Sequence, residues 1–155
     1  ALDEPDGLLC MGGDLSVPRL RHAYQQGIFP WYNEEEPLLW WSPAHRMVLI
    51  PEDIHISRSL AKAIRINQPQ YYINRNFETV IQYCAEITRA SPGRWIHDEM
   101  IAAYIDLFEA GDAFSIEVEI NGRLAGGLYG VKTEYVFSGE SMFSRHTNGS
   151  KYALV

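Results

Sequence analysis

Residues 114–131 read FSIEVEINGRLAGGLYGV, and this run establishes the architecture of the C-terminal part of the chain. Apolar and polar residues alternate from Phe114 to Ile120, which is typical of a half-buried β-strand. Asn121-Gly122 follows and favours a hairpin, because both central residues of a type I′ turn need a positive φ. Residues 124–131 then return as a glycine-rich strand, and residues 135–143 predict a third strand. We therefore expect an antiparallel meander.

Helical signals precede the meander. In each of four segments, apolar residues recur at helical spacing behind a capping or acidic residue. These segments begin near Ser16, Ser57, Asn76 and Asp98. Two short strands are also predicted, a buried one at residues 47–51 and another at residues 71–73. Helices and an antiparallel sheet in successive stretches predict an α+β fold.

A small N-terminal lobe is predicted ahead of the main domain. Residues 28–43 are rich in aromatic residues and prolines, and proline favours extended backbone in the residue before it. We place the boundary at residues 43–45, so that residues 1–44 form the lobe and residues 45–155 the larger domain. The chain starts without Met and ends inside a short helix that Ser150 is expected to cap. We therefore expect a fragment of a longer protein, incomplete at its C-terminus.

The charge is unevenly distributed along the chain. The 155 residues carry a net charge of −7, which excludes a uniformly basic nucleic-acid binder. The net charge is −5 over residues 1–44, +2 over residues 45–90 and −4 over residues 91–155. The basic middle contains Arg58, Lys62 and Arg65, at spacings that put them on one helix face. Such an island suits local phosphate binding, although a solvated helix face explains the same charges.

Several classes of protein can be set aside. No apolar run approaches the ~18 residues that a membrane-spanning helix needs, and no charged start leads into the apolar stretch of a signal peptide. Cys10 and Cys84 are too few for a disulfide framework and are typical of a reducing compartment. The five histidines show no paired ligand spacing, so we expect no metal site.

Glu140 is a candidate for chemistry in the third predicted strand. Strict alternation places it on one face with Ser138 and Met142, beside a glycine-rich strand. A half-buried carboxylate in such a place can take a shifted pKa and bind a cation or an amine. A carboxylate that is paired with Arg123 or Arg145, or exposed to water, explains the same pattern.

Two further clusters have alternative explanations. Trp31, Trp40 and Trp41 pack a core by default, but they could also stack on a base or line an apolar pocket. The polar loop at residues 145–150 could bind an anion ahead of a short helix, with Lys151 nearby, or it could be a plain capped loop.

Rare strings run along most of the chain. The longest are GIFPW at residues 27–31 and GESMFSR at residues 139–145. Others are GLL at 7–9, GGDLS at 12–16, LWWSP at 39–43, HISRS at 55–59, SIEV at 115–118 and GGLYGV at 126–131. Together and in this order, they resemble the leucyl/phenylalanyl-tRNA–protein transferases of bacteria.

The resemblance implies an aminoacyltransferase. Such enzymes transfer Leu, Phe or sometimes Met from aminoacyl-tRNA to the N-terminal Arg or Lys of an acceptor protein, which marks that protein for degradation. The implied fold is a small N-terminal lobe with an N-acetyltransferase-like domain that uses no cofactor. The implied partners are the aminoacyl-tRNA and the acceptor protein, with no membrane. We expect a monomer in the cytoplasm.

The same resemblance implies that this chain is catalytically incomplete. The family's proposed catalytic Asp and Gln lie on a later strand, in a string like Ile-Asp-Cys-Gln. The chain ends at Val155, before any such string. The general base is therefore expected beyond Val155, and the fragment alone could be inactive.

Residues that match the family's motifs take their expected roles from it. Trp31 and Trp95 correspond to aromatics around the 3′ adenosine of the tRNA and the aminoacyl ester. Leu128, Phe137 and Leu154 correspond to walls of the amino-acid pocket. Many family members have Met where Leu128 stands, and Met adapts its shape more readily than Leu.

Glu140 corresponds to the carboxylate near the reacting centre, where it would partner an amine or an α-ammonium group. The basic helix that holds the tRNA acceptor stem is matched by Arg58, Lys62 and Arg65, but Ile66 stands where the family has another base. Asn148, Ser150 and Lys151 are also expected to contact the tRNA.

Two other functions stay open. One is an acyl-CoA-dependent N-acetyltransferase, whose phosphate loop, Gln/Arg-x-x-Gly-x-Gly/Ala, would lie near residues 145–150. Arg145 fits this loop, but Asn148 stands where its first Gly is required. The other is a tRNA-binding or peptide-binding module without catalytic activity.

Overall fold

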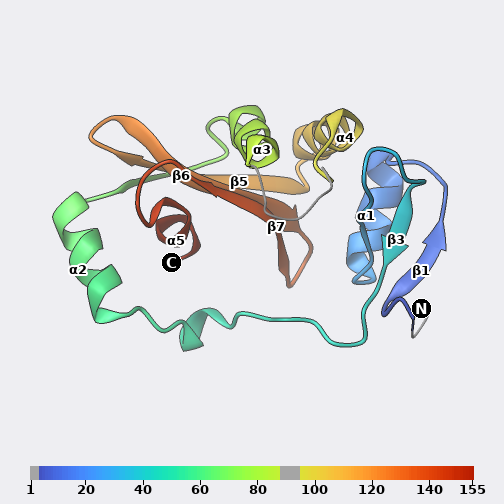
Figure 1. Cartoon of the computed structure of the whole chain (residues 1–155), viewed down its shortest axis with the longest axis horizontal. Helices are drawn as coiled ribbons and strands as arrows, with labels where there is room; N and C mark the ends of the chain where they lie inside the picture. Colours follow the sequence, from blue (N-terminus) through green and yellow to red (C-terminus); the bar gives the residue numbers. More distant parts are fainter. Residues whose placement is uncertain (1–3, 88–94) are drawn as a thin grey trace.

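The computed structural model describes residues 4–87 and 95–155, and within them helices α3 and α4 cover one face of a four-stranded antiparallel sheet (Figure 1). The strands are β4 (Gln70–Ile73), β5 (Ala113–Ile120), β6 (Arg123–Lys132) and β7 (Phe137–Ser144), in that spatial order. Helix α5 packs against the opposite face of the sheet. The predicted α+β class, the meander and the short strand at residues 71–73 are therefore confirmed.

The β5–β6 hairpin forms as its turn residues predict. Asn121 has a φ of 53° and Gly122 a φ of 71°, as a type I′ turn requires. Ile120 pairs with Arg123 across this turn, and pairing continues to Ala113 opposite Val131.

All four predicted helices are present. They are α1 (Val17–Gln25), α2 (Arg58–Asn67), α3 (Phe77–Glu86) and α4 (Asp98–Glu109). The side chains of Ser57 and Asn76 accept the capping bonds of α2 and α3 from Leu60 and Thr79, at 3.2 Å each. Ser16 precedes α1, but its side chain makes no capping bond.

The last helix, α5 (Gly149–Leu154), begins earlier than the sequence predicts. Asn148, with a φ of 68°, is the residue that flanks its start. Ser150 lies inside the helix, so its predicted capping role is wrong. Its backbone N–H donates instead to Ser144 Oγ at 2.8 Å, which ties α5 to the end of β7.

The N-terminal residues form a second sheet. Strands β1 (Leu8–Met11), β3 (Leu39–Trp41) and β2 (Phe29–Pro30) pair antiparallel in that order, within the described part of the chain. Helix α1 contacts α4, and Tyr32 Oη donates to Glu99 Oε2 at 2.9 Å. The N-terminal sheet is thereby joined to the helical layer of the main sheet.

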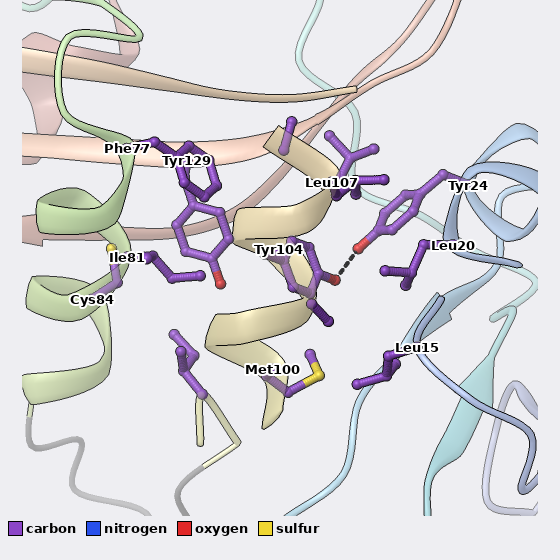
Figure 2. Close-up of a cluster of buried hydrophobic side chains, with 14 of the residues drawn as sticks. Leu15, Leu20, Tyr24, Phe77, Ile81, Cys84, Met100, Tyr104, Leu107 and Tyr129 are labelled. Atoms are coloured by element: carbon purple, nitrogen blue, oxygen red, sulfur yellow. Dashed lines mark hydrogen bonds between the residues drawn. The ribbon is translucent and has the colours of Figure 1, made fainter. Parts of the chain in front are cut away.

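Two clusters of buried apolar residues lie on the two faces of the main sheet. The larger one joins α1, α3, α4 and the helix-facing side of β6, and Figure 2 shows its centre around Tyr24, Tyr104 and Tyr129. The smaller one contains Val118, Leu128 and Tyr152, and the apolar side of α2 packs against it through Leu60 and Ile64.

The predicted buried strand at residues 47–51 is wrong. Met47 to Ile50 adopt no regular structure, and Pro51–Asp53 form a short 3-10 turn. Met47 is 99% exposed and Val48 is 74% exposed. A continuous apolar run reads as a buried strand only where a neighbouring strand covers it, and none of the described strands pairs with this segment.

Candidate active site

Glu140 lies at an irregularity in the pairing of β7 with β6. Tyr129 pairs with Ser141 and Gly130 pairs with Gly139, so Glu140 is the extra residue of a β-bulge. A bulge re-aims the side chain at its position. Glu140 accordingly turns toward α4, where its Oε2 accepts a hydrogen bond from Tyr104 Oη at 3.3 Å. Met142 pairs with Leu128 of the smaller apolar cluster, on the opposite face, so the predicted face shared by Glu140 and Met142 is wrong.

The surroundings of Glu140 raise the pKa of its carboxyl group. Loss of hydration on burial raises its pKa to about 7, against hydrogen bonds from Tyr24 and Tyr104 and the charge of Arg46, which lower it. Among the described residues, neither Arg123 nor Arg145 forms an ion pair with it. Arg145 lies instead over the ring of Tyr83, with its guanidinium carbon 4.6 Å from the ring centre.

Two tyrosines from different helices meet at Glu140. Tyr24 comes from α1 and Tyr104 from α4, both are buried, and their hydroxyls are hydrogen-bonded to each other (Figure 2). Desolvation and the nearby carboxylate raise the pKa of both phenols well above the ordinary value, so both stay protonated. Sequence reasoning missed both tyrosines, because each one looks locally like an ordinary core position of an amphipathic helix.

Arg46 is a third residue that the sequence did not single out. Its guanidinium carbon lies 4.6 Å above the ring of Phe29, and its Nη1 donates to the carbonyl of Gly27 at 3.3 Å. These contacts hold the cation on strand β2 and the turn before it, close enough to lower the pKa of Glu140. Gly27 and Phe29, which belong to the string GIFPW, thus hold the side chain of Arg46 in place.

Of the residues predicted to line an amino-acid pocket, Leu128 and Phe137 lie in the main sheet and Leu154 lies in α5. Leu128 is buried in the smaller apolar cluster and pairs with Met142 across β6 and β7. Phe137 begins β7 and Leu154 ends α5, and these two side chains are 44% and 46% exposed. An added Cβ at Gly130 would lie 2.2 Å from the carbonyl oxygen of Ser138 and 2.6 Å from Cζ of Phe137. Gly130 is thus required by this close approach.

The tryptophans divide into packed and accessible side chains. Trp40 is buried, and its Nε1 donates to the carbonyl of Gly12 at 2.9 Å. Trp31 is 49% exposed, with its ring 5.7 Å edge-on from that of Trp41. Trp95 is half-buried against the larger apolar cluster. Trp31 therefore offers an indole surface to a ligand, whereas Trp40 is a packing residue.

The basic side chains of α2 project away from its packed face. Arg58, Lys62 and Arg65 are exposed, while Leu60 and Ile64 pack against the smaller cluster. Asn67, the last residue of α2, donates from Nδ2 to Tyr152 Oη at 2.9 Å. This bond joins the basic helix to α5, which carries Lys151 on its exposed side.

The first backbone N–H groups of α5 already donate hydrogen bonds within the protein. The N–H of Gly149 donates to the carbonyl of His146 at 2.8 Å, and that of Ser150 donates to Ser144 Oγ at 2.8 Å. Asn148 is half-buried and Lys151 is exposed. Any contact of this region with an anion therefore falls mainly to side chains.

Within residues 4–87 and 95–155, no three His, Cys, Asp or Glu side chains converge as they would around a metal ion. A cleft of about 270 Å³ lies between α1 and the β6–β7 turn, with Arg21, Tyr24 and Lys132 in its walls. None of the predicted substrate residues lines this cleft. The described part of the chain contains no helix that is long and apolar enough to cross a membrane.

The comparisons with known proteins all match the chain to the same kind of transferase. A family model described as leucyl/phenylalanyl-tRNA protein transferase matches residues 48–155, and one described as the N-terminal domain of that transferase matches residues 13–44. The leucyl/phenylalanyl-tRNA–protein transferase of Idiomarina loihiensis is 53% identical over 155 residues, and that of Nitrosomonas europaea is 56% identical over 155 residues. Each alignment covers 100% of this chain and 66% of the relative, so the chain spans just under two thirds of their length.

Proposed function

Because this chain belongs to the leucyl/phenylalanyl-tRNA protein transferase family, we propose that the protein transfers Leu or Phe, and sometimes Met, from aminoacyl-tRNA to the N-terminal Arg or Lys of acceptor proteins. The acceptor is thereby marked for degradation. The observation that carries the proposal is the match along the whole chain, including the string around Glu140, to relatives named leucyl/phenylalanyl-tRNA–protein transferase.

The reaction is the aminolysis of an ester. The α-amine nitrogen of the acceptor attacks the carbonyl carbon of the aminoacyl ester, a C–N bond forms, and the C–O bond to the ribose breaks. The amine loses one proton and the ribose oxygen gains one. The protein must hold a neutral amine against the carbonyl, receive its proton and stabilise the oxyanion.

We assign Glu140 to the acceptor amine. A half-buried carboxyl with a pKa of about 7 can accept a hydrogen bond from an amine and exchange a proton with it at neutral pH.

Two surfaces are proposed to bind the aminoacyl end of the donor tRNA. Trp31 and Trp95 are proposed to stack around the 3′ adenosine and the ester, which is supported by the accessible indole of Trp31. Leu128, Phe137 and Leu154 are proposed to receive the side chain of the transferred amino acid, since Leu128 belongs to the smaller apolar cluster and Leu154 ends α5. An apolar pocket separates Leu from smaller side chains by only ~1–3 kcal/mol per methylene.

The tRNA is assigned to the exposed bases of α2 and to the start of α5. Arg58, Lys62 and Arg65 would contact acceptor-stem phosphates, with Asn148, Ser150 and Lys151 beside them. The bond between Asn67 and Tyr152 holds these two helices together. We further propose that residues 1–44 act as a lobe that supports Trp31, and that the protein works as a cytoplasmic monomer.

The direct test uses the full-length protein, labelled Leu-tRNA and an Arg-initiated peptide. We expect label at the peptide's N-terminus, and none on the same peptide with an acetylated N-terminus. Absence of label on the free peptide would overturn the proposal. Transfer of acetyl groups from acetyl-CoA in a parallel reaction would favour an N-acetyltransferase instead.

A further inference from the structure

Three polar groups form a buried hydrogen-bonded chain that links the N-terminal helix to strand β7. Tyr104 Oη donates to Glu140 Oε2 at 3.3 Å, and Tyr24 Oη is hydrogen-bonded to Tyr104 Oη. A tyrosine hydroxyl has one proton to donate. While Glu140 is ionised, Tyr104 gives its proton to the carboxylate, so Tyr24 must be the donor to Tyr104.

Packing alone does not require these hydroxyls. The rings of Tyr24 and Tyr104 meet edge-on at 6.5 Å, and those of Tyr104 and Tyr129 meet edge-on at 5.7 Å. Phenylalanine would make the same ring contacts without burying an oxygen, and a buried hydroxyl destabilises the fold unless it is hydrogen-bonded. The two hydroxyls are hydrogen-bonded to each other, and that of Tyr104 is also hydrogen-bonded to Glu140.

The bulge gives this chain a function in placing the carboxylate. Glu140 has no partner residue in β6, so regular pairing does not set its orientation. The hydroxyl of Tyr104, on a helix whose core face is buried, supplies a rigid reference point instead. A carboxylate held by a buried helix keeps its position more accurately than one held only by its own strand.

We propose that Tyr104 is a positioning residue for Glu140 and that Tyr24, which is bonded to Tyr104, assists it, so that helix α1 helps to orient the carboxylate that receives the acceptor amine. The inference rests on the proposed function. The charged and titratable groups that face this carboxylate are Tyr24 from α1, Arg46 from the segment before α2 and Tyr104 from α4, with Tyr129 of β6 beside Tyr104.

The kinetic test compares Tyr104→Phe and Tyr24→Phe in the full-length protein, with Tyr72→Phe as control. Tyr72 also donates a hydroxyl hydrogen bond, to Gln70 at 2.9 Å, but on the opposite outer strand β4. We expect Tyr104→Phe to lower kcat about tenfold, because it removes a hydrogen bond to a charged group, and Tyr24→Phe to lower kcat as well. Tyr72→Phe should leave kcat unchanged.

Two readouts separate positioning from a general structural role. The hydroxyls lower the pKa of Glu140, so Tyr104→Phe should move the pH dependence of kcat/KM for the acceptor toward alkaline values. The double variant Tyr24→Phe/Tyr104→Phe should lose less activation free energy than the sum of the two single losses, because both hydroxyls belong to one hydrogen-bond network around Glu140. Unchanged kcat and an unchanged pH profile in Tyr104→Phe would overturn the inference.

A titration without turnover distinguishes this inference from the proposed function. Protein labelled with ¹³C at the glutamate carboxyls is titrated by NMR, and Glu140→Gln identifies the signal of Glu140. We expect a higher titration midpoint in Tyr104→Phe than in the wild type. If the wild type transfers no amino acid but the midpoint rises, the proposed function fails and the hydroxyl chain stands. If transfer occurs and the midpoint does not move, the positioning role fails.

Discussion

The buried carboxylate of Glu117 accepts a hydrogen bond from Ser115 Oγ at 2.6 Å, two positions earlier on the same strand. It also accepts the backbone N–H groups of Arg75 and Asn76, at 3.1 and 3.3 Å. One carboxylate therefore satisfies three donors and ties the start of α3 to the middle of the sheet.

Replacing Glu117 with Ala should lower the free energy of unfolding by about 1–3 kcal/mol, since buried donors lose their acceptor. Chemical denaturation followed by circular dichroism measures this loss. Glu119→Ala is the matched control, because Glu119 pairs with the exposed Arg75 at the surface. A surface pair contributes ~0–1 kcal/mol, so equal losses in the two variants would contradict this role of Glu117.

Gly126→Ala should also destabilise the fold. A Cβ at this position would lie 2.4 Å from the carbonyl carbon of Gly149, where α5 packs on β6. Such overpacking typically costs about 1–3 kcal/mol. Gly139→Ala provides the comparison, since no atom lies within 4 Å of its added Cβ. Thermal melts should show a lower Tm for Gly126→Ala only, and an unchanged Tm there would mean that α5 does not sit against Gly126.

Glu140→Gln should remove the dependence of stability on pH that this carboxyl contributes. Its pKa is about 7 in the folded protein against 4.5 for an ordinary glutamate, so the folded state binds the proton more tightly. This contribution to stability is complete below pH 4.5 and is lost as the pH rises toward 7. The wild type should therefore lose more Tm than Glu140→Gln between these pH values. Parallel Tm curves for the two proteins would exclude a raised pKa.

The same substitution is expected to reduce transfer while the fold stays intact. Gln has nearly the shape of Glu but cannot accept a proton from an amine at neutral pH. Initial rates with Leu-tRNA and an Arg-initiated peptide, together with the near-ultraviolet circular dichroism spectrum, measure both properties. A variant with wild-type turnover would show that Glu140 has no part in the reaction.

Lys62→Ala should weaken tRNA binding and lower its salt dependence. Each phosphate contact contributes about one unit to the slope of log K against log salt, so the slope should fall by about one. Filter binding at several salt concentrations measures it. Arg123→Ala changes the charge equally at the exposed β5–β6 turn and should leave the slope as it is. Equal effects of the two variants would indicate a response to net charge alone.

The sequence by itself determined the elements whose signals are local. Ser57 and Asn76 cap their helices because a side chain bonds an N–H three residues away, and Asn121-Gly122 turns the hairpin through its own φ angles. The distinctive strings of residues likewise led to the family, which the comparisons confirmed. These properties depend on residues that are close along the chain.

Only the tertiary structure decided how distant segments meet. The apolar run at Met47 is exposed because none of the described strands covers it, and Glu117 is buried because α3 packs over it. Glu140 faces Tyr104 because a bulge breaks the alternation of β7, and a bulge is set by pairing between two strands. Burial, register and hydrogen bonds between helices depend on partners far away in sequence, which no local pattern specifies.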